Sequence, residues 1–303
     1  MRRQCRVPYA PYRLWIEPTN RCNLACVMCP NASFEESELG FMDLDLYRAI
    51  VDESAGFVYD INLHHRGEPT LHPELPEMVR IAKTRNIQVK LHTNGTALTE
   101  KMSSRLIDAG LDLISFSFDG YTAEIYEKIR CKADFEKTLS NIRRFLALKQ
   151  KRGTTKPKAV MEVMELEGVG DPDIKNRFIK NLEEQGLDRV IVKQPHNWGG
   201  NVELTTYQST DFTPCTFPWH ALVILWDGRV ECCPHDFFGK IQLGDVSKNS
   251  LREIFNDKPI RELRSRMLSG SWDVLTSPCK ECDSVRRKNA CGLPLASLKY
   301  LKE

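Results

Sequence analysis

Two groups of cysteine residues in this chain have the spacing of metal ligands. Cys22, Cys26 and Cys29 have three and then two residues between them, so that one short loop carries three thiols. Three thiolates can hold three irons of a cubane iron-sulfur cluster and leave the fourth iron open to another ligand. A zinc site built from two pairs of ligands does not explain three clustered thiols, and free core cysteines would need no such spacing. The loop therefore predicts a cluster with an open iron.

The second group lies in the last third of the chain. An Asp-Gly turn at 227–228 between apolar runs predicts a hairpin, which returns Cys233 toward Cys215. A C-x2-C turn, Cys279 and Cys282, follows a helix expected over Leu251–Met267. These four thiols can form a tetrathiolate site, in which the adjacent Cys232 could replace Cys233. By spacing alone, a structural zinc fits this site as well as a cluster.

Composition narrows the class of protein. The 303 residues include 43 basic and 41 acidic side chains, a net charge of +2, without a basic block. We therefore expect no nucleic-acid partner and no membrane partner. No apolar run reaches the ~18 residues of a spanning helix, and no apolar stretch follows Arg2 and Arg3 as in a signal peptide. We expect a cytoplasmic protein whose eleven cysteines bind metal instead of forming disulfides.

Short apolar runs alternate with amphipathic stretches, a pattern typical of βα units and a parallel sheet. The expected strands are Leu14–Glu17, Tyr59–His64, Ile87–His92, Leu113–Phe118, Ala159–Met164 and Arg189–Lys193. The expected helices are Leu44–Ser54, Pro76–Thr84, Glu100–Ala109, Ala123–Lys149 and Ile174–Gln185. Six such units predict an α/β fold, a partial (β/α)6 barrel with its helices outside. A small α+β domain of hairpin and helix follows, with the boundary near residue 205, giving domains 1–205 and 206–303.

The first cysteine loop, which follows a strand-like Leu-Trp-Ile-Glu, resembles the cluster motif of the radical S-adenosylmethionine (SAM) enzymes. Arg66-Gly67-Glu68-Pro69 resembles the Gly-Gly-Glu segment of that family, with Arg66 in place of its first glycine, and Thr93-Asn94-Gly95 resembles its Thr-Asn-Gly. The resemblance implies a [4Fe-4S] cluster whose open iron chelates SAM and cleaves it to a 5′-deoxyadenosyl radical. The SAM contacts that it implies are Met28, Arg66, Gly67, Glu68, Pro69, Asn94, Ser117 and Arg130.

The second group of cysteines resembles the Twitch form of the SPASM-type extension found in these enzymes. This resemblance implies one auxiliary [4Fe-4S] cluster held by Cys215, Cys233, Cys279 and Cys282. Within the family, the chain is most similar to the Twitch-bearing aminocyclitol dehydrogenases. That similarity implies a radical SAM oxidoreductase that takes hydrogen from a polar small molecule, such as a sugar or aminocyclitol, and passes an electron to the auxiliary cluster. A flavodoxin- or ferredoxin-type protein is the expected electron donor.

The catalytic base is expected near the carboxyl ends of the barrel strands. His64, His65 and His92 are expected at such ends, and imidazole is the side chain best suited to proton transfer near neutrality; Lys193 joins them if it is buried.

The sequence is also compatible with three other functions. A redox-neutral epimerase would use a thiol as hydrogen donor, and Cys131, Cys232 and Cys291 are unassigned. A peptide-modifying maturase would use the same clusters on a peptide. An iron-sulfur electron carrier or sensor would need the cysteines but not the SAM-binding segments.

Overall fold

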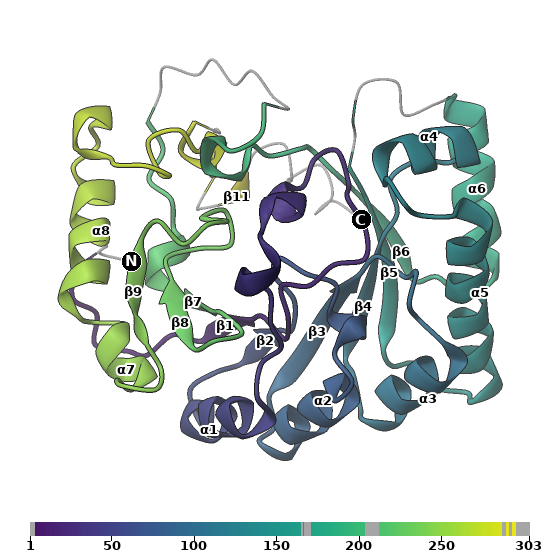
Figure 1. Cartoon of the computed structure of the whole chain (residues 1–303), viewed down its shortest axis with the longest axis horizontal. Helices are drawn as coiled ribbons and strands as arrows, with labels where there is room; N and C mark the ends of the chain where they lie inside the picture. Colours follow the sequence, from purple (N-terminus) through teal and green to yellow (C-terminus); the bar gives the residue numbers. More distant parts are fainter. Residues whose placement is uncertain are drawn as a thin grey trace. The chain divides into compact units, whose positions relative to one another are not determined.

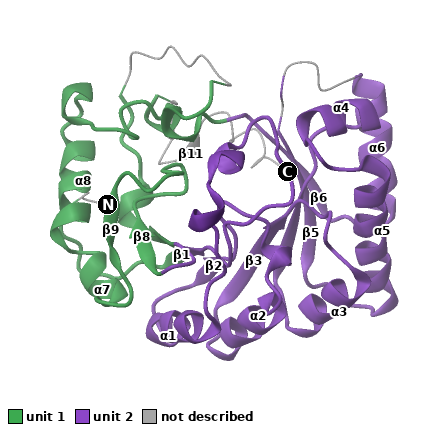
Figure 2. Cartoon of the chain, viewed as in Figure 1, with its two compact units in different colours: residues 1–14, 196–224, 228–303 green, residues 15–195, 225–227 purple. Residues whose placement is uncertain are grey.

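The computed structural model describes residues 4–164, 166, 171–203 and 212–286, and the backbone of two short strands at 289–290 and 293–294. The chain divides into two compact units (Figure 2). Unit 1 comprises residues 1–14, 196–224 and 228–303, and unit 2 comprises residues 15–195 and 225–227. The expected boundary near residue 205 lies outside the described residues.

Unit 2 is built on a parallel sheet (Figure 1). Its strands follow the order β6-β5-β4-β3-β2-β1, and the pairs from β2 to β6 are parallel. Their bounds are β1 Arg13–Ile16, β2 Asp60–Asn62, β3 Gln88–Thr93, β4 Leu113–Ser117, β5 Lys158–Met164 and β6 Arg189–Lys193. Each expected strand is present, although β2 is shorter than expected. The fold class is the predicted α/β partial barrel.

The helices of unit 2 lie outside these strands (Figure 1). Their bounds are α1 Leu44–Ser54, α2 Leu75–Thr84, α3 Glu100–Asp108, α4 Ala123–Ile129, α5 Phe135–Lys151 and α6 Pro172–Glu184. Side-chain oxygens cap several of their first turns: Asp43 accepts from two amides of α1, and Thr99 accepts from Met102 in α3. Alternate strand residues, such as Val89 and Leu91 of β3, are fully buried, so that the other residues of each strand form the opposite face of the sheet.

The expectation of one helix over Ala123–Lys149 is wrong. The chain leaves the helix at Arg130, and Lys132 has φ of 72°, a conformation that no α-helix contains. Asp134 then caps the new helix α5 by accepting from the amide of Lys137. The amphipathic pattern runs through the break, and therefore hides it from sequence analysis.

Unit 1 contains an antiparallel sheet in the order β7-β8-β9, with bounds Ala221–Ile224, Arg229–Glu231 and Gln242–Asp245. The expected Asp-Gly hairpin is confirmed as the β7–β8 pair. The expected helix Leu251–Met267 is two helices, α7 Leu251–Ile254 and α8 Lys258–Leu268, because Asp257 is an extended N-cap followed by a proline in the first turn. A short pair, β10 Asn289–Ala290 and β11 Leu293–Pro294, follows.

The first described residues, Gln4 and Cys5, pack in unit 1. The buried Arg264 donates to the carbonyl of Cys5 at 2.9 Å, and the indole of Trp219 donates to the carbonyl of Gln4 at 2.8 Å. None of the helices in the described part of the chain combines the length and apolar character that crossing a bilayer requires.

Candidate active site

The three cysteines of the first loop form a thiol group in unit 2. Burial raises the pKa of Cys22 to about 12 and that of Cys29 to about 11, and it also raises the pKa of Cys26. Such thiols ionise readily only beside positive charge, which a bound metal supplies. The amide nitrogen of Asn94 lies 4.0 Å from Sγ of Cys22, and a guanidinium nitrogen of Arg130 lies 3.9 Å from Sγ of Cys26. Hydrogen-bond donors that point at the cysteine sulfurs are what thiolate ligands of an iron-sulfur cluster require, because they stabilise the negative charge on sulfur.

The break between α4 and α5 supports this loop. The amides of Ala25 and Val27 donate to the carbonyls of Cys131 and Ile129, at 3.1 and 3.0 Å. A continuous helix would engage the Ile129 carbonyl in its own ladder. The break that sequence analysis missed is therefore part of the support for the cluster loop.

Gly67 lies against the backbone on the amino-terminal side of the same loop. A Cβ atom at this position would come within 2.4 Å of the Thr19 carbonyl oxygen and 2.5 Å of that of Arg21. Only glycine permits this approach. The amide of Glu68 then donates to the Arg21 carbonyl at 2.8 Å, which fixes the Arg-Gly-Glu segment beside the cysteines.

Glu68 is 2% exposed, and its carboxylate accepts four hydrogen bonds from its own chain. Oε1 accepts from the amide and hydroxyl of Thr70 and the hydroxyl of Thr93, and Oε2 accepts from the amide of Asn94 at 2.6 Å. Burial raises the pKa of Glu68 although these donors oppose it. Glu68 therefore joins the two segments that resemble SAM-binding motifs.

We expect Glu68→Ala to lower both stability and SAM affinity. Three buried donor residues lose their acceptor, and each unsatisfied donor costs about 1–3 kcal/mol of unfolding free energy. The displaced segments should bind SAM about tenfold more weakly or worse. Chemical denaturation and anaerobic calorimetry with SAM measure the two effects, and Glu124→Ala at an exposed position of α4 is the control. Unchanged denaturation and binding in Glu68→Ala would contradict this role.

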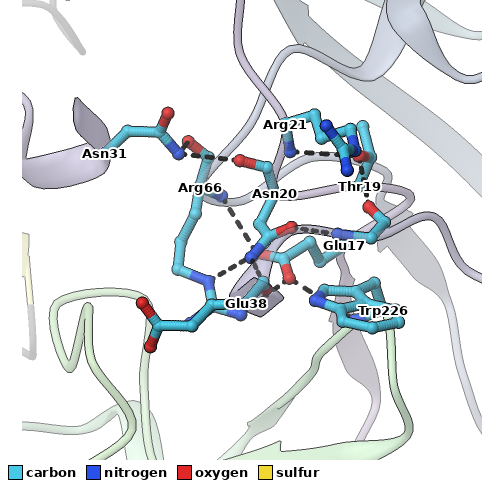
Figure 3. Close-up of polar contacts among 9 residues, drawn as sticks. Glu17, Thr19, Asn20, Arg21, Asn31, Glu38, Arg66 and Trp226 are labelled. Carbon is cyan, nitrogen blue, oxygen red and sulfur yellow. Dashed lines mark hydrogen bonds and ion pairs between the residues drawn. The ribbon is translucent and has the colours of Figure 1, made fainter. Parts of the chain in front are cut away.

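Arg66 forms a buried ion pair with Glu17 (Figure 3). Its Nε and Nη2 donate to the two carboxylate oxygens of Glu17 at 2.7 and 2.8 Å, and its guanidinium lies 5.1 Å from the ring centre of Phe34. Burial alone would raise the pKa of Glu17, but Arg66 outweighs it and holds that pKa below its ordinary value. The side-chain amide of Asn31 donates to the backbone carbonyls of both Arg66 and Asn20. Arg66, which replaces the first glycine of the family motif, thus links the Arg-Gly-Glu segment to the end of β1 through its ion pair with Glu17.

Arg130 also makes an ion pair, with Asp119 at 2.6 Å. Asp119 in turn accepts from the amide of Met164 at 2.6 Å, so that the pair joins the break after α4 to the end of β5. Nε of Arg130 is buried and has no hydrogen-bond partner among the described residues. The expected contact of Arg130 with the SAM carboxylate stays a prediction, for which this nitrogen offers a donor.

Two of the four expected base candidates, His92 and Lys193, meet at a further group, Glu162. Lys193 is exposed, so the burial on which its expected role as a base depended is absent. Oε2 of Glu162 lies 3.4 Å from Nδ1 of His92 and 2.5 Å from Nζ of Lys193. The ring centres of His64 and His92 lie 4.0 Å apart. His65 lies instead near Glu17, whose pKa its charge helps to lower. Glu162 was not among the expected site residues, although a lone carboxylate inside the apolar strand Ala-Val-Met-Glu-Val-Met was a visible signal.

The other expected SAM contacts also belong to unit 2. Met28 is buried beside Cys29, and Pro69 begins a short 3-10 turn to Leu71. Ser117 ends β4, in register with Glu162 of β5. The thiol of Cys131, one of the unassigned cysteines, donates to the carbonyl of Lys128 at 3.6 Å. Cys291 lies outside the described residues.

Unit 1 contains the second thiol group. Burial raises the pKa of Cys282 well above its ordinary value, and the negative charges of Cys233 and Cys215 raise it further. Cys232 is fully buried and contacts Cys233 and Cys279. Its thiol donates to Oδ2 of Asp236 at 3.5 Å. That partner favours Cys232 as a protonated thiol, so that Cys233 stays the predicted ligand beside Cys215, Cys279 and Cys282. Four thiolates are a donor set that suits a cluster or zinc.

Comparisons with known proteins agree with this geometry. The model of the radical SAM superfamily matches residues 16–160, and that of the SPASM iron-sulfur cluster-binding domain matches residues 215–283. The chain carries a radical SAM domain and a SPASM domain. The two family resemblances are thereby confirmed, and with them a SAM-binding [4Fe-4S] cluster and an auxiliary cluster as cofactors.

Individual relatives differ in what they act on. The cofactor-modifying protein of the tungsten-containing aldehyde ferredoxin oxidoreductase from Pyrococcus furiosus is 35% identical over 228 residues, covering 73% of this chain and 57% of that protein. The PqqA peptide cyclase of Gluconobacter oxydans is 26% identical over 315 residues, covering 93% and 85%. The solved structure of BtrN with AdoMet and 2-DOIA superimposes with a TM-score of 0.62, covering 95% of this chain and all of that one. The two sequences are 19% identical, and at that level the similarity shows a shared fold and no more.

Proposed function

We propose that this radical SAM enzyme is an oxidoreductase that converts an alcohol carbon of a polar small molecule, a sugar or aminocyclitol, to a ketone. The observation that carries the proposal is the second thiol group, Cys215, Cys233, Cys279 and Cys282, whose four sulfurs leave an auxiliary cluster without an open iron. A cluster closed by protein ligands is suited to accepting an electron. The fold shared with BtrN, a structure that contains AdoMet and 2-DOIA, supports the choice of an aminocyclitol-like substrate.

The residues of unit 2 have separate tasks in this proposal. Cys22, Cys26 and Cys29 hold the first cluster, and Asn94 and Arg130 donate toward two of their sulfurs. When bound, the two clusters supply the electron that cleaves SAM and the acceptor for the electron that leaves the substrate. The further SAM contacts are the residues around the loop: Met28, Arg66, Gly67, Glu68, Pro69, Asn94, Ser117 and Arg130. A small-molecule substrate and a flavodoxin- or ferredoxin-type donor are the partners, and we place the protein in the cytoplasm.

The test of this proposal is the double variant Cys279→Ala/Cys282→Ala. It should keep the SAM-binding cluster, so that iron falls from about eight to about four per chain while SAM cleavage continues. Ketone formation should fall far more than 5′-deoxyadenosine formation, because hydrogen removal continues without the electron acceptor. Iron analysis and product quantification measure the two effects.

The folding of unit 1 is the control for that variant, because a filled metal site also stabilises a small domain. The variant must stay monodisperse and bind SAM as tightly as the parent. If the parent protein itself contains about four irons and one zinc per chain, the electron-acceptor role is wrong and a redox-neutral epimerase is the better proposal. Incorporation of deuterium from heavy water would identify that epimerase, and failure to cleave SAM would identify a carrier or sensor.

A peptide-modifying maturase is the second candidate. The 26% identity to a PqqA peptide cyclase extends over 93% of this chain, through both domains. Peptides therefore belong in every substrate panel. A modified peptide together with unmodified alcohols would favour this candidate.

A further inference from the structure

One face of the parallel sheet in unit 2 carries a layer of polar side chains. The register places His92 of β3 opposite Ser115 of β4, and Glu162 of β5 opposite Ser117, two residues further along β4. Side chains two residues apart on a strand share a face. The polar layer consists of Asn62, His92, Ser115, Ser117, Glu162 and Lys193, together with His64, whose ring centre lies 4.0 Å from that of His92. On the opposite face, Leu91, Phe116 and Met161 are fully buried.

The centre of this polar layer is the pair of His92 and Glu162. The Glu162 carboxylate lies 3.4 Å from Nδ1 of His92 and is also bound by Lys193 at 2.5 Å. Burial would raise the pKa of Glu162, but the hydrogen bond and charge of His92 and the charge of Lys193 lower it to about 2. An ionised carboxylate at Nδ1 holds the proton on that nitrogen, and the lone pair of a neutral ring is then on Nε2.

Three buried atoms of the polar layer have no hydrogen-bond partner among the described residues: Nδ2 of Asn62, Nδ1 of His64 and Oγ of Ser115. Asn62 is 6% exposed and Ser115 is fully buried. Burial, together with the charges of His92, His65 and Lys193, lowers the pKa of His64 and keeps its ring neutral. Buried polar groups in proteins almost always have partners, so these three atoms indicate a ligand that supplies them.

We infer that His92 is the catalytic base, that Glu162 is the residue that positions it, and that Asn62, His64 and Ser115 bind neighbouring hydroxyl groups of the substrate. This inference rests on the proposed function. With SAM and both clusters bound, Nε2 of His92 would take the O–H proton, while the 5′-deoxyadenosyl radical would supply the acceptor for the C–H hydrogen and the auxiliary cluster the acceptor for one electron. Loss of these three leaves a C=O bond, so that atoms and electrons balance.

The charges of the polar layer narrow the substrate class. Lys193 compensates Glu162, and Lys90 on the same face compensates Asp60 at 2.5 Å. A layer without excess positive charge suits an uncharged or amino-bearing polyol and disfavours a phosphorylated one.

The experiment uses the reconstituted full-length protein with SAM, dithionite and the alcohol that the parent oxidises best in a panel of inositols, aminocyclitols and hexoses. In His92→Ala, 5′-deoxyadenosine should still form, and it should take deuterium from a substrate labelled at the oxidised carbon. Ketone formation should fall about 10²- to 10⁴-fold. Added imidazole should restore part of it, because a free base can enter the space left by the ring. Glu162→Gln, which keeps the side-chain shape, should also lower ketone formation, without rescue by imidazole.

The control is Lys158→Met at the other end of β5, whose side chain is 57% exposed and pairs with Asp188. It should match the parent. If the parent oxidises an alcohol and His92→Ala oxidises it equally well, or loses SAM cleavage and ketone together without imidazole rescue, the assignment of the base is wrong while the proposed function stands. If the parent cleaves SAM but oxidises no alcohol of the panel, the proposed function and this inference both fail.

Discussion

Simultaneous replacement of Cys22, Cys26 and Cys29 by alanine is expected to abolish reductive SAM cleavage. The three thiols are the proposed cluster ligands on the first loop, and the donors of Asn94 and Arg130 are aimed at two of them. Without the three sulfurs no open iron remains to chelate SAM. Chromatographic measurement of 5′-deoxyadenosine after anaerobic incubation with dithionite should give only background, and iron should fall to about four per chain.

The triple serine variant of the same cysteines is a matched control, because it keeps the size of the side chains while weakening iron binding. It should also lose cleavage. Cys131→Ala removes a thiol of unit 2 outside the loop and should cleave SAM normally. Formation of 5′-deoxyadenosine by the triple alanine variant above background would contradict the assignment of the loop.

The second large effect is expected at the ion pair of Glu17 and Arg66. Glu17 is fully buried, and it also accepts from the backbone amides of Arg66 and Trp226 at 3.3 and 3.4 Å. Glu17→Gln leaves the guanidinium buried without its compensating charge, which typically costs about 3–5 kcal/mol of unfolding free energy. Because Arg66 belongs to the Arg-Gly-Glu segment, SAM binding should weaken as well. Urea denaturation and anaerobic SAM titration measure these effects.

Two control variants show whether the loss of stability in Glu17→Gln comes from an uncompensated buried charge. The double variant Glu17→Leu/Arg66→Met removes both charges and should lose less stability than Glu17→Gln, since no uncompensated charge remains. Arg85→Gln disrupts an exposed ion pair with Asp52, whose side chain is 46% exposed, and should cost at most about 1 kcal/mol. Equal stability of Glu17→Gln and the parent would show that the ion pair does not hold the segment.

The sequence was most informative where local chemistry decides the structure. Three closely spaced cysteines, an Asp-Gly turn and alternating apolar strands each act over a few residues, and the cluster motif, the β7–β8 hairpin and strands β1 to β6 were predicted from them. The amphipathic pattern could not reveal the break at Arg130. That break depends on the carbonyls of Ile129 and Cys131 meeting the cluster loop, a contact between segments about a hundred residues apart.

The candidate base was predicted only in part for the same reason. His64 and His92 stood out by residue type and place on their strands, whereas Glu162 looked like one charge in an apolar strand. Its importance comes from the register, which brings β5 and β6 beside β4 and so places Glu162 against His92 and Lys193. Likewise, Arg66 looked like a departure from a family pattern, and only the fold pairs it with Glu17.

The most direct test of the central claim is the mass of the product. The reconstituted protein is incubated anaerobically with SAM, dithionite and a panel of sugars, aminocyclitols and peptides, and each mixture is analysed by mass spectrometry. Our account predicts that one polar alcohol loses two hydrogens, in an amount that matches the 5′-deoxyadenosine formed. Formation of 5′-deoxyadenosine with every alcohol unchanged in mass, or with a peptide as the only compound altered, would contradict it.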